Sequence, residues 1–203
     1  MSEPRRIGVF GGTFDPIHNT HLAIAHAARD QANLDLVLFV VSANPPHKRG
    51  ANLESAEDRL ALVEAALMNE PDMAPSRIEI DRDGPSYTAD TLDALHDQFP
   101  DAALFLIIGM DSLIDLPKWR APERILSRAY LLVVPRPGED AAPESLRGKY
   151  TLLTFPENDL SSTDVRSRLE SGDPCTDALP HAVSDLIKLR GLYRECAEHS
   201  TRR

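Results

Sequence analysis

Cysteine is scarce in this chain, and long hydrophobic runs are missing from it. The two cysteines, Cys175 and Cys196, lie in neither a metal-binding nor a Cys-x-x-Cys spacing. The chain therefore offers little basis for a disulfide framework, and we expect free thiols in a reducing compartment. No stretch approaches the ~18 consecutive apolar residues of a membrane span, and the few apolar residues after the N-terminal segment are too short for a signal-peptide core. We expect a cytoplasmic protein that does not associate with membranes.

Positive charge is also in short supply. The chain has 22 Lys and Arg against 32 Asp and Glu, which gives a net charge of −10. This balance argues against a broad nucleic-acid-binding face, although it allows a local basic pocket for one phosphorylated ligand. The length of 203 residues fits one domain with a substantial core. We expect a single domain over 1–203, with a core in 1–160 and a helical C-terminal part in 161–203.

The most informative stretch runs from Ile7 to His21, with the sequence Ile-Gly-Val-Phe-Gly-Gly-Thr-Phe-Asp-Pro-Ile-His-Asn-Thr-His. Its first four residues predict a short buried strand, and the Gly-Gly pair that follows allows a ligand to approach the backbone closely. The alanine-rich sequence beyond it predicts a helix that begins near Asn19. His18 and His21 then lie at a helix N-terminus, where free N–H groups and the positive end of the dipole favour an anion. The stretch predicts a phosphate-binding site.

This stretch differs from two common glycine-rich loops, because it lacks the Lys-Ser/Thr of a P-loop and the third glycine of the dinucleotide fingerprint. Gly-Gly-Thr-Phe-Asp-Pro followed by His-x-x-His instead resembles the opening of the nucleotidyltransferase superfamily. The resemblance implies adenylyl or cytidylyl transfer, with ATP bound by Gly11, Gly12, Thr13, Phe14, His18 and His21.

Thr20 is a departure from the usual family form of this tail, which is His-x-Gly-His. If the glycine serves close approach of the backbone to a phosphate, threonine crowds that phosphate. If it only starts a helix, threonine costs a few tenths of a kcal/mol. The sequence leaves both readings open.

Strand patterns and helical patterns alternate along the rest of the chain, which predicts an α/β fold with a parallel sheet. Further strands are expected at 34–42, 77–81, 103–109 and 129–135, with a sixth candidate at 150–155. The resemblance implies a more specific arrangement. It is a Rossmann-like, doubly wound parallel sheet of order 3-2-1-4-5 with a small helical C-terminal part.

A proline-rich loop, 43–50, follows the second predicted strand and carries His47 and Lys48. Open α/β sheets place ligands at the carboxyl ends of their strands. An isolated loop lysine is more often a solvated surface charge. Pro-Pro-His-Lys, however, resembles a segment of the nicotinate-nucleotide adenylyltransferases, which implies phosphate binding by Lys48 and contact of Asn44 with the nicotinate nucleotide. His47 either shares that role or is a plain loop residue.

The string Ser86-Tyr87-Thr88 precedes another predicted helix. Ser86 or Thr88 serves as the N-cap by local rules. The exposed N–H groups of such a turn also suit a carboxylate. The string resembles the same family, and the resemblance implies that this turn contacts the pyridine carboxylate.

Asp111 and Trp119 follow the clearest predicted strand. Asp111 either accepts hydrogen bonds from ribose hydroxyls or caps the next helix. Trp119, the only tryptophan, either packs as a plug or stacks on an aromatic ring. Gly-x-Asp-Ser-Leu followed by Pro-x-Trp-Arg resembles the nicotinate-nucleotide branch. The resemblance implies that Asp111, Trp119 and Arg120 hold the nicotinate nucleotide, with its pyridine ring on Trp119.

A second motif lies at 160–169. With Ser161 as N-cap, Asp164 falls at the capping-box position. Local folding leaves Ser162, Thr163 and Arg166 unexplained, and their donors lie where a polyphosphate could enter. The string resembles the Ile-Ser-Ser-Thr-x-x-Arg signature of the superfamily, which implies ATP binding by Ser161, Ser162, Thr163 and Arg166.

The resemblance covers nearly the whole chain and is closest to bacterial-type nicotinate-nucleotide adenylyltransferases, which join ATP and nicotinate mononucleotide. Attack of the mononucleotide phosphate on the α-phosphorus needs no protein nucleophile, so catalysis consists of positioning and charge stabilisation. We expect Mg²⁺ to act through water and phosphate oxygens, with no metal ligands from the protein. The expected catalytic residues are His18, His21, Lys48 and Arg166.

Two alternatives stay open at this stage. A sibling enzyme acts on nicotinamide mononucleotide or on phosphopantetheine; Trp119 and the 86–88 turn argue against phosphopantetheine, whereas backbone donors accept an amide oxygen as well as a carboxylate. A nucleotide-binding regulator without activity is favoured by Thr20 alone, and the retained histidines, Lys48 and Arg166 argue against it. The sequence does not indicate an oligomeric state.

Overall fold

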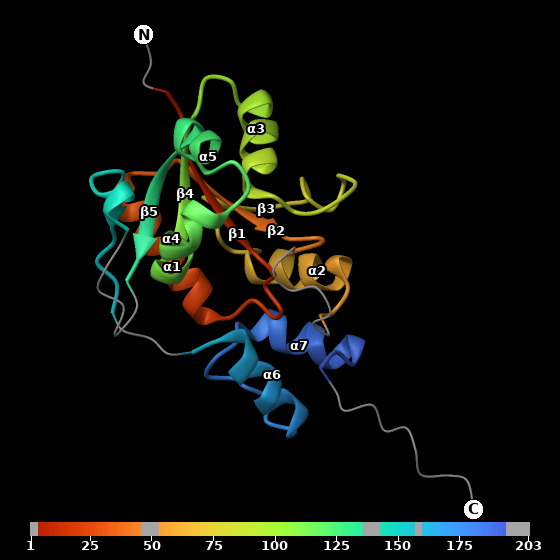
Figure 1. Cartoon of the computed structure of the whole chain (residues 1–203). Coiled ribbons are helices and arrows are strands. Elements are labelled where there is room, and N and C mark those ends of the chain that lie inside the picture. Colours follow the sequence, from red (N-terminus) through yellow and green to blue (C-terminus); the bar gives the residue numbers. More distant parts are fainter. Residues whose placement is uncertain (1–3, 46–52, 136–142, 157–159, 194–203) are drawn as a thin grey trace, which may run out of the picture.

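A computed structural model of the chain describes residues 4–45, 53–135, 143–156 and 160–193. Strands and helices alternate through most of the chain (Figure 1). In order, the elements are β1 (Arg6–Gly12), α1 (Asn19–Ala32), β2 (Leu36–Val41), α2 (Ala56–Ala66), β3 (Met73–Ser76), α3 (Thr88–Gln98), β4 (Ala103–Gly109), α4 (Met110–Asp115), α5 (Pro122–Arg128), β5 (Ala129–Val134), β6 (Tyr150–Leu152), α6 (Ser162–Glu170) and α7 (His181–Arg190). None of the helices in the described ranges is both long enough and apolar enough to cross a membrane.

The six strands form one parallel sheet in the order β3-β2-β1-β4-β5-β6. The predicted five-strand order is confirmed, and β6 extends it by one strand. The chain therefore proceeds outward from β1 in one direction through β2 and β3, and then resumes on the other side of β1 with β4. Open α/β sheets bind ligands at this reversal, outside the carboxyl ends of the strands.

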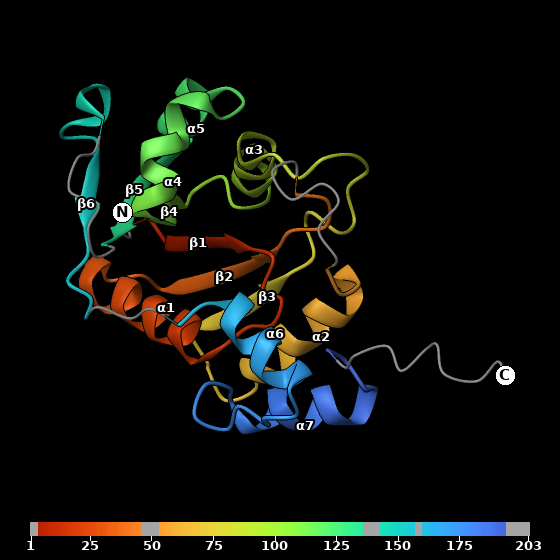
Figure 2. The ribbon, with the colours of Figure 1, turned by 60° about the horizontal axis from the view of Figure 1, so that its bottom comes forward.

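Helices cover both faces of the sheet (Figure 2). Along β1, Ile7 and Val9 face one hydrophobic cluster with residues of α3, α4 and α5, while Phe10 faces another with residues of α1, α2, α6 and α7. Because both faces are buried, the strands are nearly continuous apolar runs, as is typical of parallel sheets. This confirms the predicted doubly wound, Rossmann-like architecture.

The third strand is not the predicted segment 77–81. It is β3, which pairs with Val37–Val40 of β2 at the edge of the sheet, where Pro75 is tolerated because its missing N–H faces no neighbour. Segment 77–81 is a turn closed by a hydrogen bond from the Asp81 N–H to the Arg77 carbonyl oxygen at 2.9 Å. Its alternating pattern arises because Ile78 and Ile80 pack against the two hydrophobic clusters, although the segment has no partner strand.

Helix starts follow local rules in two cases and depart from them in two. Ser55 caps α2, and Ser161 caps α6 in the expected capping box with Asp164. The N-cap of α3, however, is Tyr87 and not Ser86 or Thr88. The N-cap of α4 is Gly109, so the capping role considered for Asp111 is also wrong. In both places, polar side chains beside the carboxyl edge of the sheet do not serve as N-caps.

Candidate active site

A cavity of about 290 Å³ opens at the carboxyl ends of β1, β2 and β4. The ladder between β1 and β4 ends at the pair Phe10 and Ile107, so the two strands separate beyond that point. The cavity occupies this crevice. Its lining includes six residues predicted as site residues, which are Gly11, Gly12, Thr13, Ser86, Thr88 and Trp119.

The two glycines that end β1 have different reasons to be glycine. A Cβ built on Gly11 would meet nothing within 4 Å, so this residue leaves open space beside the cavity. A Cβ on Gly12 would lie 3.0 Å from the ring of Phe14. That ring is 2 % exposed and packs between Phe10 and Phe39. Phe14 can therefore meet a ligand only through its backbone.

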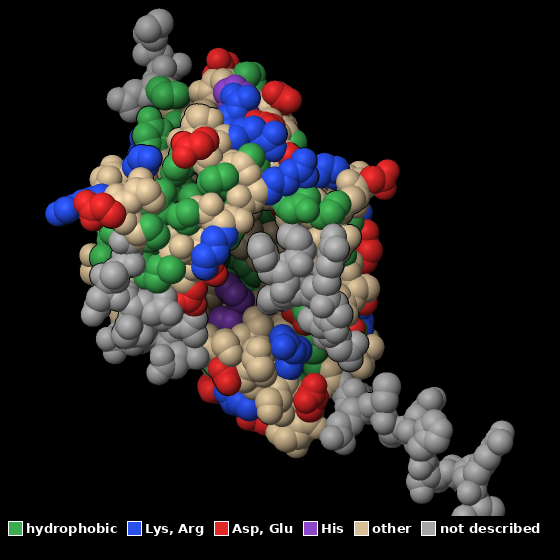
Figure 3. Space-filling model, viewed as in Figure 1, with side chains coloured by type: hydrophobic (Ala, Val, Ile, Leu, Met, Phe, Trp, Pro, Cys, Tyr) green, Lys and Arg blue, Asp and Glu red, His purple; other side chains and the backbone are tan. Residues whose placement is uncertain are grey.

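His18 and His21 lie together at the start of α1, as predicted. Their ring centroids are 3.8 Å apart, and the His18 N–H donates to Nδ1 of His21 at 3.2 Å. The His21 ring also meets the edge of Phe14 at 5.1 Å, which fixes its plane. Figure 3 shows histidine side chains on the floor of a hollow in this face of the molecule. Two imidazoles thus lie together at one helix start, where the positive end of the helix dipole favours an anion.

Burial lowers the pKa of His18 to about 4, against an attraction to Asp164 that raises it. The side chain is 3 % exposed, so the neutral imidazole is the form present at neutral pH. A neutral imidazole donates one hydrogen bond and needs no counterion. The buried His18 imidazole becomes protonated at neutral pH only when a nearby anion offsets the free-energy cost of removing its positive charge from water.

This depressed pKa predicts a pH-dependent loss of stability. The unfolded chain takes up the proton first as pH falls, so the stability is complete above the ordinary pKa of histidine and is lost as pH falls toward about 4. Between about pH 7 and about pH 4.5, wild type should lose about 2 kcal/mol more unfolding free energy than His18→Asn. Urea unfolding at several pH values measures this difference. Parallel pH dependences in the two proteins would contradict the assignment.

Helix α6 reaches the same place from 146 residues further along the chain. The Ser162 hydroxyl donates to the Pro16 carbonyl oxygen at 3.1 Å. The Arg166 guanidinium donates to the Asp15 carbonyl oxygen at 2.7 Å and to Thr163 Oγ1 at 3.3 Å. The predicted residues of the two motifs are thus brought together. The starts of α1 and α6 thus meet at the loop of residues 15 and 16.

The loop after β2 is joined to the start of α3. The Asn44 N–H donates to Ser86 Oγ at 3.1 Å, and the Ser86 N–H donates to the Asn44 carbonyl oxygen at 3.0 Å. Asn44 therefore lies at the rim of the cavity that Ser86 lines. His47 and Lys48, which belong to the same loop, lie outside the described residues.

Among the described residues predicted to hold the nicotinate nucleotide, Asn44, Tyr87, Asp111 and Arg120 do not line the cavity. The guanidinium of Arg120 lies 4.5 Å from the centre of the Tyr87 ring, with Nη1 3.5 Å from Asp90 Oδ2. Asp111 is the second residue of α4 and is half-buried, next to Ser112, which does line the cavity. Trp119 packs against the hydrophobic cluster of α3 to α5, as in the first role considered for it, and it also lines the cavity, where stacking on an aromatic ring stays a prediction.

Sequence reasoning missed several polar residues of the lining, namely Ser42, Glu79, Thr91 and Ser112. Ser42 follows β2, so the rule of carboxyl strand ends would have found it. Thr91 lies three residues after Thr88 on α3, which places both on one face. Its hydroxyl donates to Glu79 Oε1 at 2.6 Å, and Glu79 is 7 % exposed. Glu79 had no signal, because its segment was assigned to a strand.

Thr20 is the second residue of α1 and points into the protein. It is 7 % exposed, and its Oγ1 finds no hydrogen-bond partner among the described residues. It is not part of the cavity lining. The crowding of a phosphate considered for Thr20 thus has no support from the position of its side chain.

The described part of the chain holds no group of three or more His, Cys, Asp or Glu side chains that could bind a metal ion. The donors gathered at the starts of α1 and α6 are imidazole, hydroxyl, guanidinium and backbone N–H groups. Mg²⁺ prefers oxygen ligands and keeps several waters in phosphate sites. This donor set suits the phosphates of a metal–nucleotide complex.

Comparison with known proteins gives consistent results. The model of the family "Cytidylyltransferase-like" matches residues 9–168. A "probable nicotinate-nucleotide adenylyltransferase" of Gloeobacter violaceus is 43% identical over 197 residues, which cover 93% of this chain and 96% of the relative. One of Roseiflexus sp. (strain RS-1) is 45% identical over 199 residues, which cover 93% of this chain and 98% of the relative.

Solved structures agree on the fold. The nicotinic acid mononucleotide adenylyltransferase of Plasmodium falciparum complexed with NaAD superposes with a TM-score of 0.78 at 19% identity, over 93% of this chain and 97% of that chain. The same enzyme complexed with APC gives a TM-score of 0.76 at 19% identity, over the same shares. The Rossmann-like arrangement is therefore shared well beyond the range of close sequence similarity.

Proposed function

This chain belongs to the nicotinate-nucleotide adenylyltransferases of the cytidylyltransferase-like family, and we propose that the site described above transfers the adenylyl group of ATP to nicotinate mononucleotide. The products are the nicotinate dinucleotide and pyrophosphate, in a step of NAD biosynthesis. The observation that carries this proposal is an aromatic, hydroxyl-lined cavity bordered by Gly11 to Thr13, the segment that leads directly into the loop where the donors at the starts of α1 and α6 meet.

The cavity suits the nicotinate nucleotide. Trp119 offers a face for the pyridine ring, since offset stacking of aromatic rings is favourable. Ser86 and Thr88 present hydroxyls beside the first N–H groups of α3, which suit a carboxylate. Asn44 and Tyr87 shape the rim, and Arg120 is held beside Tyr87 with its charge shared with Asp90. Asp111, at the carboxyl end of β4, is placed to accept hydrogen bonds from ribose hydroxyls.

The triphosphate binds at the starts of α1 and α6. His18 and His21 contact the α- and β-phosphate oxygens, and Arg166 neutralises charge from the side of α6. Gly11 leaves space for the nucleotide and Thr13 lines the cavity beside it, while Phe14, which is not part of the lining, is assigned to ATP through its backbone. Donors at the start of α6 anchor ATP, and these are Ser161, Ser162 and Thr163. Lys48, outside the described residues, is assigned to phosphate on its sequence alone.

The chemistry needs no covalent enzyme intermediate. A phosphate oxygen of the mononucleotide forms a new bond to the α-phosphorus of ATP, while the bond from that phosphorus to the bridging oxygen breaks and releases pyrophosphate. The chain holds the two reactants in line and stabilises the charge that moves to the leaving oxygens. Mg²⁺ bound to the phosphates supplies further charge neutralisation. The cytoplasm, which supplies ATP, is the compartment in which we propose that this reaction takes place.

Pyrophosphate release tests the proposal directly. Purified protein with ATP and Mg²⁺ receives nicotinate mononucleotide, nicotinamide mononucleotide or phosphopantetheine in parallel. We expect rapid release with the nicotinate nucleotide and a kcat/KM at least about 10²-fold lower with the amide, because a site built for a carboxylate leaves donors poorly satisfied by an amide. Equal use of acid and amide would overturn the assigned selectivity. Folded protein that binds ATP but releases no pyrophosphate with any of the three would favour the inactive regulator.

A further inference from the structure

A tyrosine that follows α7 reaches back to the loop after β1. Tyr193 is 7 % exposed, and its hydroxyl donates to Asp15 Oδ1 at 2.8 Å across 178 residues of sequence. Asp15 is fully buried in the loop that links the glycine pair to His18. Burial and the adjacent Asp15 carboxylate raise the pKa of Tyr193 far above its ordinary value, so the hydroxyl stays protonated and donates.

The carboxylate of Asp15 has few other donors in the described structure. The Glu54 N–H lies 3.3 Å from Oδ1, and Oδ2 has no hydrogen-bond partner among the described residues. The nearest cation is Arg166, whose Nη1 lies 3.6 Å from Oδ2 while it donates to the backbone oxygen of Asp15 at 2.7 Å. Buried carboxylates with unmet acceptors draw donors toward themselves. The direction in which Arg166 points therefore depends on how well Asp15 is satisfied.

The geometry points to Tyr193 as a positioning residue for Arg166, acting through the buried carboxylate of Asp15. This inference rests on the function proposed above, in which Arg166 serves the phosphates of ATP. With the tyrosine hydroxyl in place, Asp15 Oδ1 is satisfied, and Arg166 donates to the Asp15 carbonyl oxygen and to Thr163 Oγ1 and keeps its remaining N–H donors for phosphate. Without the hydroxyl, the carboxylate competes with phosphate for the guanidinium.

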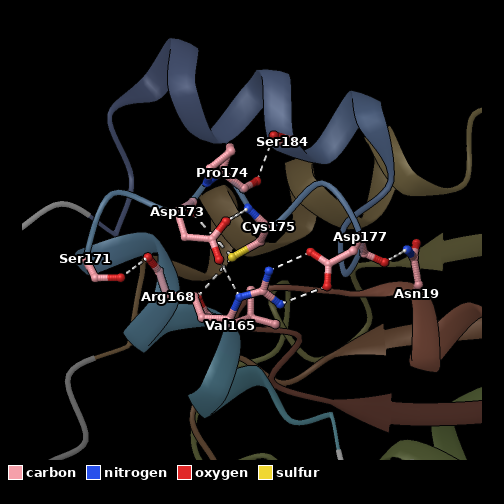
Figure 4. A network of polar contacts seen from close by, with 9 residues as sticks. All are labelled: Asn19, Val165, Arg168, Ser171, Asp173, Pro174, Cys175, Asp177 and Ser184. Atoms are coloured by element: carbon pink, nitrogen blue, oxygen red, sulfur yellow. Dashed lines mark hydrogen bonds and ion pairs between the residues drawn. The ribbon is translucent and has the colours of Figure 1, made fainter.

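The C-terminal part has other contacts that keep it in place when this hydroxyl is lost. Arg168 of α6 pairs with Asp173 at 2.7 Å and with Asp177 at 2.5 and 3.1 Å (Figure 4). The segment that carries these acids holds the start of α1, because Asn19 Nδ2 donates to the Asp177 carbonyl oxygen at 3.0 Å. The backbone N–H of Tyr193 also donates to Glu54 Oε1 at 3.1 Å, which a phenylalanine preserves. Tyr193→Phe therefore removes one donor without undocking α6 or α7.

The test compares Tyr193→Phe with wild type and with Tyr130→Phe. Tyr130 is a suitable control because it is 66% exposed on β5 and stacks on Phe105, away from the site. We expect Tyr193→Phe to raise the KM and the equilibrium dissociation constant for ATP about tenfold, as loss of one hydrogen bond to a charged group does. The KM for nicotinate mononucleotide and the values for Tyr130→Phe should stay within about twofold of wild type.

A double-mutant cycle separates positioning from a general structural role. In an Arg166→Lys background, which removes the forked donor, Tyr193→Phe should add little further loss of ATP affinity. A full, additive loss in that background would overturn the inference, as would a lowered melting temperature with an unchanged dissociation constant for ATP. Equilibrium ATP binding shows whether the effects of the two substitutions are additive even if the wild-type protein releases no pyrophosphate. Failure of the proposed reaction is thus distinguishable from failure of this inference.

Discussion

Replacing His21 by alanine is expected to lower kcat by about 10²- to 10³-fold, as removal of one preorganised donor to developing charge does in other enzymes. The imidazole lies at the first turn of α1 with its ring centroid 3.8 Å from that of His18, and both face the place assigned to the α- and β-phosphates. Because the donor acts on charge that grows during phosphoryl transfer, kcat should fall more than ATP affinity. Steady-state kinetics with nicotinate mononucleotide measures this loss.

His26→Ala provides the matched control for this experiment. His26 lies on the same helix, is partly exposed and has Nε2 3.3 Å from Glu70 Oε2, on a side of α1 away from His21. Its removal should leave kcat within about twofold of wild type, as is usual for surface positions. Circular dichroism of both variants should match wild type. Near-normal turnover of His21→Ala would remove His21 from the catalytic residues.

Replacing Arg59 by methionine is expected to destabilise the fold by about 3–5 kcal/mol, as breaking a buried charged network does. Arg59 is 1 % exposed on α2, and its Nη1 donates to the carbonyl oxygens of Thr13 at 2.6 Å and Ser42 at 2.8 Å. Its Nε donates to the Glu54 carbonyl oxygen at 2.9 Å. Methionine fills much of the volume but leaves three buried acceptors without this donor, and it removes a positive charge that interacts with the buried Asp15.

Arg77→Met is the corresponding control for Arg59→Met. Arg77 is largely exposed and pairs with Glu57 and Asp81 on the surface. Exposed ion pairs contribute about 0–1 kcal/mol. Urea unfolding of Arg77→Met should therefore show a decrease of at most about 1 kcal/mol in the free energy of unfolding. A loss below about 1 kcal/mol for Arg59→Met would show that water replaces the guanidinium without difficulty. In any folded fraction of Arg59→Met, the loops at the ends of β1 and β2 should bind both substrates more weakly.

The features that sequence reasoning located correctly depend on neighbours a few residues away. The start of α1 at Asn19 and the capping box of Ser161 and Asp164 are confirmed because the deciding hydrogen bonds join residues three apart. Strand β4 is confirmed because its apolar run is bounded on both sides. The carboxyl edge of the sheet was located because every parallel strand ends there.

The features that it missed depend on partners far apart in the sequence. Strand β3 contains Pro75 and is a strand only because β2 lies beside it, whereas the alternating segment 77–81 has no such neighbour. Asp15 lies inside the most recognisable motif, yet its partners at Arg166 and Tyr193 are 151 and 178 residues away. A pattern within one window cannot show a contact over that distance.

The long sequence distance between Asp15 and its partners also determines when the site is completed during synthesis of the chain. Asp15 and the histidine pair leave the ribosome long before Arg166 and Tyr193, which complete their surroundings. The sheet strands β1 to β5 can pair during synthesis, but the phosphate end of the site is assembled only when α6 and α7 have emerged. On the function proposed above, a nascent chain, or a product of premature termination before Arg166, carries both histidines but lacks the arginine assigned to the phosphates, and it should bind ATP more weakly than the full chain.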